Sequence, residues 1–366
     1  MNSYIQQIET KNPPVSYKQQ TIRDRMKHFI ADDRRTQAII HKIYKESGID
    51  KRHSVIQDYT EEPSEYLLFH PNDGILNPTT GQRNAIYQKQ AGPMFVDIAR
   101  CLLNKSRYKP EDITHVITVS CTGFFAPGPD FEIVESLGLS PHTQRFHLGF
   151  MGCYAAFPAL RMAHSFCQSQ PDARVLVVSV ELCTLHFQAS KNIDHLIGAA
   201  VFADGGAGAI IANEKPDDTP SLGMRTFANS ITDGGKKDMA WTIGDHGFEM
   251  VLSTYVPDII ESNLDRVMTP LLAKANIGAE DIDYWGLHPG GRAIVDKVQS
   301  NLELTDSQVE ASRYVLANYG NMSSATIFFV LKQLLENPEV DSDSTILGLA
   351  FGPGLTIESG LFKKSL

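Results

Sequence analysis

The chain has few cysteines, no long apolar run and no excess of basic residues. Its 366 residues include five cysteines without a C-x-x-C spacing, so we expect neither a disulfide framework nor a metal site. No run of about 18 apolar residues is present, which argues against a membrane span. The formal net charge of −10 opposes binding to nucleic acid.

The first residues also lack the order of a signal peptide, in which basic residues precede an apolar segment. We therefore expect a cytoplasmic protein. Hydrophobic residues make up 42% and charged residues 21% of the sequence, which is ordinary for a folded protein. The length suffices for two packed units or for one large domain with two cores.

Short β-rich runs alternate with helical patterns along the chain. The β-rich runs lie at 115–121, 174–180 and 345–350. Helical patterns lie near 20–46, 92–105, 130–137, 153–169, 255–276, 291–300 and 322–336. This alternation predicts an α/β fold.

A weak internal repeat refines this architecture. Residues 110–117 and 278–287 each contain a polar turn with Glu-Asp-Ile that leads into a hydrophobic run. A polar segment with two prolines at 213–221 is the natural break between the two copies. We therefore predict two similar halves, residues 1–213 and 214–366.

Cys153 is the first candidate for catalysis. It follows Gly-Phe-Met-Gly and precedes an alanine-rich helical pattern, which places it in the predicted first turn of a helix. The positive end of a helix dipole favours a thiolate and lowers the pKa of a thiol from about 8.5 to roughly 3.5–7.5. The alternative is a buried cysteine that only fills the core.

Three further motifs are candidates, and each has a structural alternative. His288, in Leu-His288-Pro-Gly-Gly, ends a short predicted strand, where catalytic groups of α/β proteins gather. Asn321 precedes a predicted helix, where asparagine often serves as an N-cap. The Gly352-Pro353-Gly354 turn is either a simple hairpin or a backbone that approaches a substrate closely.

Taken together, these motifs resemble the type III polyketide synthases of the bacterial type, a chalcone synthase-like branch of the thiolase-fold enzymes. The resemblance rests on Gly-Cys153, Leu-His288-Pro-Gly-Gly, Tyr-Gly-Asn321-Met-Ser-Ser-Ala and Phe-Gly352-Pro-Gly-Leu-Thr-Ile-Glu, in this order, and covers nearly the whole chain. It implies a homodimer of thiolase-like subunits. Each subunit would contain two βαβ halves with mixed sheets in α/β/α/β/α layers, with Cys153 in the first half and His288 and Asn321 in the second.

The resemblance also implies the reaction. An acyl-CoA starter would load onto Cys153 as a thioester, and malonyl-CoA would lose carbon dioxide and attack it. His288 would pair with the thiolate, and His288 and Asn321 would stabilise the enolate. Cyclisation would give an alkylpyrone, an alkylresorcinol or a phloroglucinol-type product. The CoA thioesters are substrates, so no cofactor is expected.

Several cavity positions follow from the same resemblance, with ordinary core packing as the alternative for each. Phe202 matches an aromatic gatekeeper, and Met250 replaces a second aromatic gatekeeper with a softer side chain. Trp241 stands near a position where plant enzymes have glycine, so the indole would narrow the pocket. The other predicted substrate-binding residues are Cys121, Cys183, Ser323, Gly352, Pro353 and Gly354.

For the CoA phosphates, Lys42 matches a basic position of the family, whereas Ile39 and Glu46 replace two other cations. A solvated basic face is the alternative.

Two other functions are compatible with the sequence. One is a ketoacyl-ACP synthase III-like enzyme that condenses once, and the other is a thiolase-fold scaffold that binds acyl-CoA without catalysis.

Overall fold

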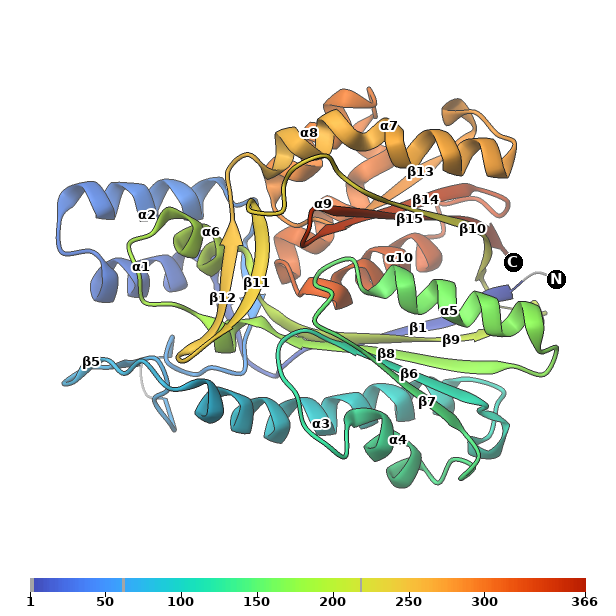
Figure 1. The fold of residues 1–366 in the computed structure, drawn as a ribbon, viewed down its shortest axis with the longest axis horizontal. Helices are drawn as coiled ribbons and strands as arrows, with labels where there is room; N and C mark the ends of the chain where they lie inside the picture. Colours follow the sequence, from blue (N-terminus) through green and yellow to red (C-terminus); the bar gives the residue numbers. More distant parts are fainter. Residues whose placement is uncertain (1–2, 61–62, 218) are drawn as a thin grey trace.

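The computed structural model describes residues 3–60, 63–217 and 219–366 and has the predicted α/β architecture (Figure 1). The strands are β1 (Ser3–Lys11), β2 (Ser16–Lys18), β3 (Lys51–His53), β4 (Phe69–His70), β5 (Gly74–Ile75), β6 (His115–Ser120), β7 (Gln144–Gly149), β8 (Arg174–Leu182), β9 (Asp204–Ala212), β10 (Ser221–Ile231), β11 (Met239–Gly244), β12 (Gly247–Leu252), β13 (Tyr284–Leu287), β14 (Thr345–Gly352) and β15 (Thr356–Ser365). The α-helices are α1 (Gln19–Ile30), α2 (Arg34–Glu46), α3 (Thr80–Lys105), α4 (Pro129–Leu137), α5 (Ala156–Ser169), α6 (Ile193–Val201), α7 (Val256–Ala275), α8 (Arg292–Asn301), α9 (Asp306–Tyr319) and α10 (Thr326–Glu336). Short 3₁₀ turns are η1 (Pro110–Asp112), η2 (Cys183–His186), η3 (Ala279–Asp281) and η4 (Ser323–Ala325).

Nine strands form one mixed sheet in the order β13-β14-β15-β10-β1-β9-β8-β6-β7. The pairs β6–β7, β6–β8 and β13–β14 are parallel, and the other neighbours are antiparallel. The three predicted β-rich runs correspond to β6, β8 and β14 and are confirmed. Strand β1 joins the two wings of the sheet, because it pairs with β9 on one side and with β10 on the other.

Helices α5 and α10 lie between the two wings of the sheet and contact both of them (Figure 1). Helix α7 covers the outer face of the β10–β15 wing, and α3 and α4 cover the outer face of the other wing. Both central helices bury large apolar side chains, with Phe157, Leu160, Phe328 and Leu331 fully buried. The result is the predicted α/β/α/β/α layering.

The internal repeat of the sequence appears as a repeated local structure. Turn η1 precedes β6, and turn η3 precedes β13. The carboxylate of Asp112 accepts a hydrogen bond from Lys109 N at 2.8 Å, and that of Asp281 accepts one from Gly278 N at 2.8 Å. The same polar turn thus precedes a strand in each wing. The division of the chain into two halves at residue 213 stays a prediction.

Some predicted helix boundaries are wrong. The pattern at 20–46 forms two helices, because the carboxylate of Asp33 accepts hydrogen bonds from Arg35 N and Thr36 N and starts α2 separately. Helix α3 begins at Thr80 rather than near 92, since Thr79 and Gln82 form a capping box there.

Within the described ranges, no helix has the length and apolar character needed to cross a bilayer.

Candidate active site

Cys153 lies in a turn between β7 and α5 rather than in the first turn of the helix. Helix α5 begins three residues later, at Ala156, and Ala155 N donates to Gly152 O at 3.0 Å. Gly152 has a φ of 83°, and a Cβ there would stand 2.4 Å from Pro353 Cδ. Only glycine therefore allows the cysteine turn to pack against the Gly352-Pro353-Gly354 turn.

Asn321 is held in place through both its backbone and its side chain. Its N–H donates to Val201 O at 2.9 Å, and its carbonyl accepts from Ala203 N at 2.8 Å. The side-chain Oδ1 accepts from Ser323 N at 2.8 Å and lies 4.0 Å from Cys153 Sγ. Because α10 starts five residues later, at Thr326, Asn321 does not cap that helix.

His288 follows β13 and is 1% exposed. Its N–H donates to Leu349 O at 2.7 Å, which continues the pairing of β13 with β14. Neither ring nitrogen has a hydrogen-bond partner among the described residues. Asn321 Nδ2 donates to Gly290 O at 3.2 Å and so ties the His288 loop to the amide that contacts Cys153. A buried imidazole without hydrogen-bond partners costs free energy, and a bound ligand would supply the missing partner.

Burial controls the ionisation of both groups. It raises the pKa of the Cys153 thiol to about 12 and lowers the pKa of His288 to about 3. The predicted place of Cys153 in the first turn of a helix is therefore wrong, and burial outweighs the hydrogen bonds of Ser323 and Asn321 in setting the pKa of its thiol. Taken separately, each group is held neutral.

Cys153 opens into a small cavity of about 330 Å³, which we call the inner cavity. Its lining includes seven of the predicted substrate-binding residues: Phe202, Met250, Trp241, Cys121, Cys183, Ser323 and Pro353. The remaining lining residues are Thr122, Gly152 and Met239. Gly352 and Gly354 lie outside the lining, as Gly352 packs on Tyr154 and Gly354 N donates to Met239 O. Lys42 is exposed on α2 and does not line the cavity.

Trp241 is anchored rather than loosely packed. It lies on β11 directly opposite Met250 on β12, and its indole Nε1 donates to Cys121 O at 2.8 Å. The ring meets His186 edge to face at 5.5 Å between centroids. His186 in turn stacks on Phe248 at 4.0 Å. The indole therefore forms a fixed wall of the inner cavity.

Glu181, which none of the sequence motifs includes, lies fully buried beside the inner cavity. Its carboxylate accepts hydrogen bonds from Cys121 N and from Thr122 Oγ1, each at 2.9 Å, and from Ser324 Oγ. Burial raises its pKa. Cys121 Sγ lies 3.4 Å from this carboxylate and 3.3 Å from Ser323 Oγ. The sequence signal for Glu181 was a charged residue within the apolar run that forms β8.

Within residues 3–60, 63–217 and 219–366, no three His, Cys, Asp or Glu side chains converge to hold a metal ion. The prediction that the site needs no metal stays a prediction.

Two family models match the chain. The model described as "Chalcone and stilbene synthases, N-terminal domain" matches residues 3–215, and its C-terminal counterpart matches residues 224–366. "Type III polyketide synthase C" of Arabidopsis thaliana is 32% identical over 78% of this chain and 77% of its own length. "Alpha-pyrone synthesis polyketide synthase-like Pks18" of Mycobacterium tuberculosis is 29% identical over 98% of this chain and 90% of its own. "Probable polyketide synthase 1" of Dictyostelium discoideum is 30% identical over the whole chain, which spans only 12% of that protein.

Solved structures agree with this result. PKS-I from the brown alga Ectocarpus siliculosus matches with a TM-score of 0.92 at 29% identity, over 99% of this chain and 98% of its own. The C-terminal type III polyketide synthase domain of Steely1 from Dictyostelium also has a TM-score of 0.92, at 28% identity, and both chains are covered completely. These matches confirm the predicted thiolase-like fold.

Proposed function

Because the chain belongs to the chalcone and stilbene synthase family and is a type III polyketide synthase, we propose that it condenses malonyl-CoA with an acyl-CoA starter held as a thioester on Cys153. The single observation that carries the proposal is the position of Asn321. Its amide lies 4.0 Å from Cys153 Sγ and is hydrogen-bonded to the loop that presents His288. A nucleophile, a base and an amide donor are thereby linked in one buried site.

Loading of the starter begins with a proton transfer from Cys153 Sγ to a ring nitrogen of His288. A buried charge is unfavourable for either residue alone, but a thiolate next to an imidazolium forms a pair without net charge. The thiolate attacks the carbonyl carbon of the starter thioester. The C–S bond to CoA breaks, and CoA leaves as a thiol after taking up the proton.

Extension follows from the decarboxylation of malonyl-CoA. Loss of carbon dioxide leaves an enolate on the CoA thioester, whose oxygen needs hydrogen-bond donors in a site without water. Asn321 Nδ2 has two N–H groups and uses one of them on Gly290 O, so the second is available. The enolate carbon attacks the Cys153 thioester, forms a C–C bond and releases the Cys153 thiolate, so the chain becomes two carbons longer.

The size of the inner cavity favours a short polyketide. The space next to Cys153 is about 330 Å³ and has an anchored indole in its wall, which favours cyclisation of a short chain. We propose an alkylpyrone as the product, with an alkylresorcinol or a phloroglucinol-type compound as alternatives. The similar protein from Mycobacterium tuberculosis, which is named for alpha-pyrone synthesis, supports this order.

Four further properties belong to the proposal. The chain would act as a homodimer, would be cytoplasmic, would contact the CoA phosphates through Lys42 and would need no cofactor beyond its CoA substrates. The family supports CoA thioesters as substrates.

The test is incubation of the protein with malonyl-CoA and a panel of starters from acetyl-CoA to long-chain acyl-CoA, followed by mass spectrometry. We expect carbon dioxide release and cyclised products that contain two or more malonyl units. A product with one malonyl unit would indicate a single-condensation enzyme. Binding of acyl-CoA without carbon dioxide release would indicate a scaffold.

A further inference from the structure

The C-terminal end of α6 is closed by side chains from distant parts of the chain. The last carbonyl groups of an α-helix have no partners within the helix, so a buried helix end needs donors from elsewhere. Ala199 O accepts hydrogen bonds from Tyr44 Oη at 3.2 Å and from Arg52 Nη1 at 2.9 Å. Ala200 O accepts one from Gln19 Nε2 at 2.7 Å. The last turn of α6 thus depends on contacts with α1, α2 and β3.

The next donor to this helix end is the backbone of Asn321. Its N–H donates to Val201 O at 2.9 Å, and its carbonyl accepts from Ala203 N at 2.8 Å. Phe202 lies between these two residues and forms a β-bridge with Asn321. The residue that the proposed function assigns to the enolate oxygen is therefore fixed in space by the end of α6.

Arg52 contacts this junction from two sides. It is 3% exposed, and its Nη1 also donates to Phe202 O. On the other side lies Gly320, the residue before Asn321, where an added Cβ would stand 2.9 Å from both Cγ and Cδ of Arg52. Gly320 has a φ of 71°, so both its backbone conformation and its approach to the arginine require glycine. Arg52 thus packs against the segments on either side of the β-bridge.

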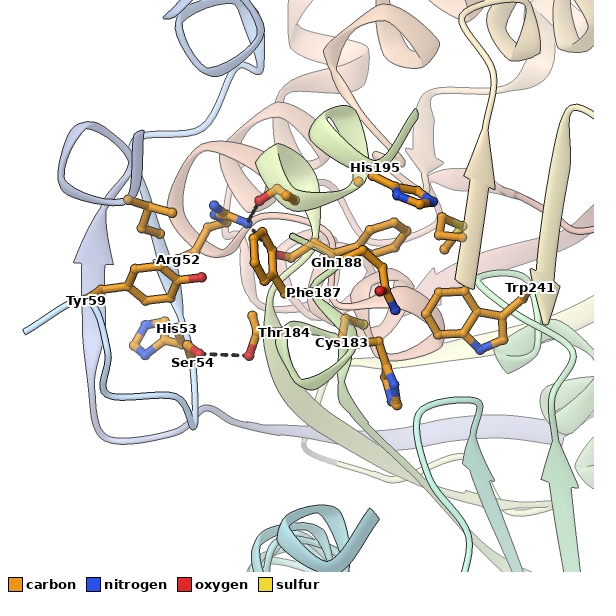
Figure 2. Close-up of a pocket in the computed structure, with 16 residues that line it drawn as sticks. Arg52, His53, Ser54, Tyr59, Cys183, Thr184, Phe187, Gln188, His195 and Trp241 are labelled. Atoms are coloured by element: carbon orange, nitrogen blue, oxygen red, sulfur yellow. Dashed lines mark hydrogen bonds between the residues drawn. The ribbon is translucent and has the colours of Figure 1, made fainter. Parts of the chain in front are cut away.

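The charge of Arg52 is directed at the negative end of a helix dipole. Its acceptors Gln19 Oε1, Ala199 O and Phe202 O are all uncharged. A cation stabilises the partial negative charge at the carbonyl end of a helix. Figure 2 shows Arg52 in the wall of a cavity beside α6, with its guanidinium turned toward this helix. The planar guanidinium holds the helix end and Gln19 together, which an ammonium on a flexible stem does less firmly.

We infer that Arg52 is a positioning residue for Asn321. It acts on the reaction through Asn321, by holding the end of α6 and the Gly320–Asn321 segment in register. The inference rests on the proposed function, in which Asn321 donates to the enolate oxygen. Loss of Arg52 should therefore slow the decarboxylation of malonyl-CoA and spare the loading of Cys153.

The experiment is a double-mutant cycle between Arg52 and Asn321. Release of carbon dioxide from malonyl-CoA is measured for the wild-type protein, Arg52→Met, Asn321→Ala and the double variant. We expect Arg52→Met alone to lower kcat by about 10- to 100-fold, the usual effect of a misplaced group. It should cause no further loss when residue 321 is already alanine, because the two residues act as one unit. Arg52→Lys, which retains the charge, should recover part of the rate.

Arg83→Met is the matched control. Arg83 is also buried, at 1% exposed, and donates to Pro78 O at 3.0 Å and to Phe187 O at 2.8 Å, at the start of α3 and just after η2. Its replacement should lower the midpoint of urea unfolding about as much as Arg52→Met does. Any effect of Arg83→Met on decarboxylation should be the same with and without the amide of Asn321.

Hydrogen exchange gives a readout that does not depend on the chemistry. The N–H of Asn321 is protected by its bond to Val201 O, so Arg52→Met should speed exchange in a peptide that covers residues 318–325. Arg83→Met should leave this exchange unchanged. If Asn321→Ala releases carbon dioxide as fast as the wild-type protein, the proposed role of Asn321 fails. Faster exchange in Arg52→Met would still support the placement of Asn321 by Arg52.

Unchanged decarboxylation in Arg52→Met, or an equal loss with and without the Asn321 amide, would overturn the inference. Unchanged exchange over residues 318–325 would overturn it as well. If Arg52→Met does not fold, Arg52→Lys takes its place in the cycle and in the exchange measurement, and the same outcomes decide.

Discussion

The amide oxygen of Asn321 lies 4.0 Å from the sulfur of Cys153, although 168 residues separate them in the sequence. The contact exists because Asn321 is pinned by backbone hydrogen bonds to Val201 and Ala203, at the end of α6. The segment between β7 and α5 and the segment between α9 and η4 thus meet at one thiol. Replacement of Cys153 should therefore stop the loading of the starter, whereas replacement of Asn321 should slow the decarboxylation of malonyl-CoA.

Cys153→Ala removes the acyl carrier. We expect no covalent acyl-enzyme in intact-protein mass spectra and no polyketide, because the thiol that carries the starter is removed. Decarboxylation of malonyl-CoA should persist in part, since His288 and Asn321 remain. Polyketide formation by this variant would contradict the role of Cys153.

Asn321→Ala removes a donor for the enolate oxygen. Malonyl-CoA decarboxylation should fall about 10²- to 10³-fold, the usual cost of one such donor, while starter loading on Cys153 continues. Asn318→Ala is the matched control, because among the described residues Asn318 Nδ2 bonds only to Tyr314 O within α9. Equal rates in the two variants would show that Asn321 does not act on the enolate.

The pH dependence of Cys153 alkylation tests the proton transfer to His288. Burial lowers the pKa of His288 to about 3 and raises that of Cys153 to about 12. Between these two pH values one proton is held by the pair, either on the thiol or on the imidazole. Below the lower pKa, His288 is already protonated and cannot accept the thiol proton. Alkylation of Cys153 by iodoacetamide should therefore be nearly independent of pH between about 5 and 9.

Cys101 serves as an internal control in that experiment. It is partly exposed, and burial raises its pKa above the ordinary value, so its alkylation should rise steadily over the same pH range. Peptide mass spectrometry separates the two sites. A parallel rise at Cys153 would mean that no thiolate–imidazolium pair forms.

Gly152→Ala should destabilise the turn that carries Cys153. The residue has a φ of 83°, and the added Cβ would stand 2.4 Å from Pro353 Cδ. Backbone strain costs about 1–2 kcal/mol, and overpacking adds about 1–3 kcal/mol. Gly138→Ala separates the two effects, because Gly138 has a φ of 63° and nothing within 4 Å. Equal midpoints in urea unfolding would exclude the clash.

Trp241→Gly should widen the inner cavity and shift products towards larger starters or more extensions. Trp241→Phe is the control, since it loses the hydrogen bond to Cys121 O but keeps most of the bulk. The product profile, read by liquid chromatography and mass spectrometry, should change in the glycine variant far more than in the phenylalanine variant. An unchanged profile in both would show that the indole does not limit the product.

Local patterns predicted the core of the fold well. Apolar runs indicated β6, β8 and β14, because strands buried on both faces are continuous in sequence. The separation of α1 from α2 was missed, since the helical pattern continues across Asp33 and only the capping geometry ends it. The motifs also indicated Cys153, His288 and Asn321, whereas their ionisation depends on burial that no local pattern encodes.

A second cavity, which shares Phe202 and Trp241 with the inner cavity, was beyond sequence reasoning for another reason. Its wall combines three segments that lie far apart in the sequence, around Arg52–Tyr59, Cys183–Gln188 and His195–Phe202. No local pattern indicates that these segments meet. A carboxylate within the apolar strand β8 is unusual, but Glu181 lies outside every motif that carries the family resemblance.

The position of the β11–β12 hairpin bears on the evolution of substrate range. It forms its own two-stranded sheet outside the nine-stranded one, and it carries Trp241 and Met250 opposite each other. Cys153, His288 and Asn321 all lie elsewhere in the chain. We therefore expect mutations confined to residues 239–252 to change the range of accepted substrates and to leave the proposed catalytic residues in place.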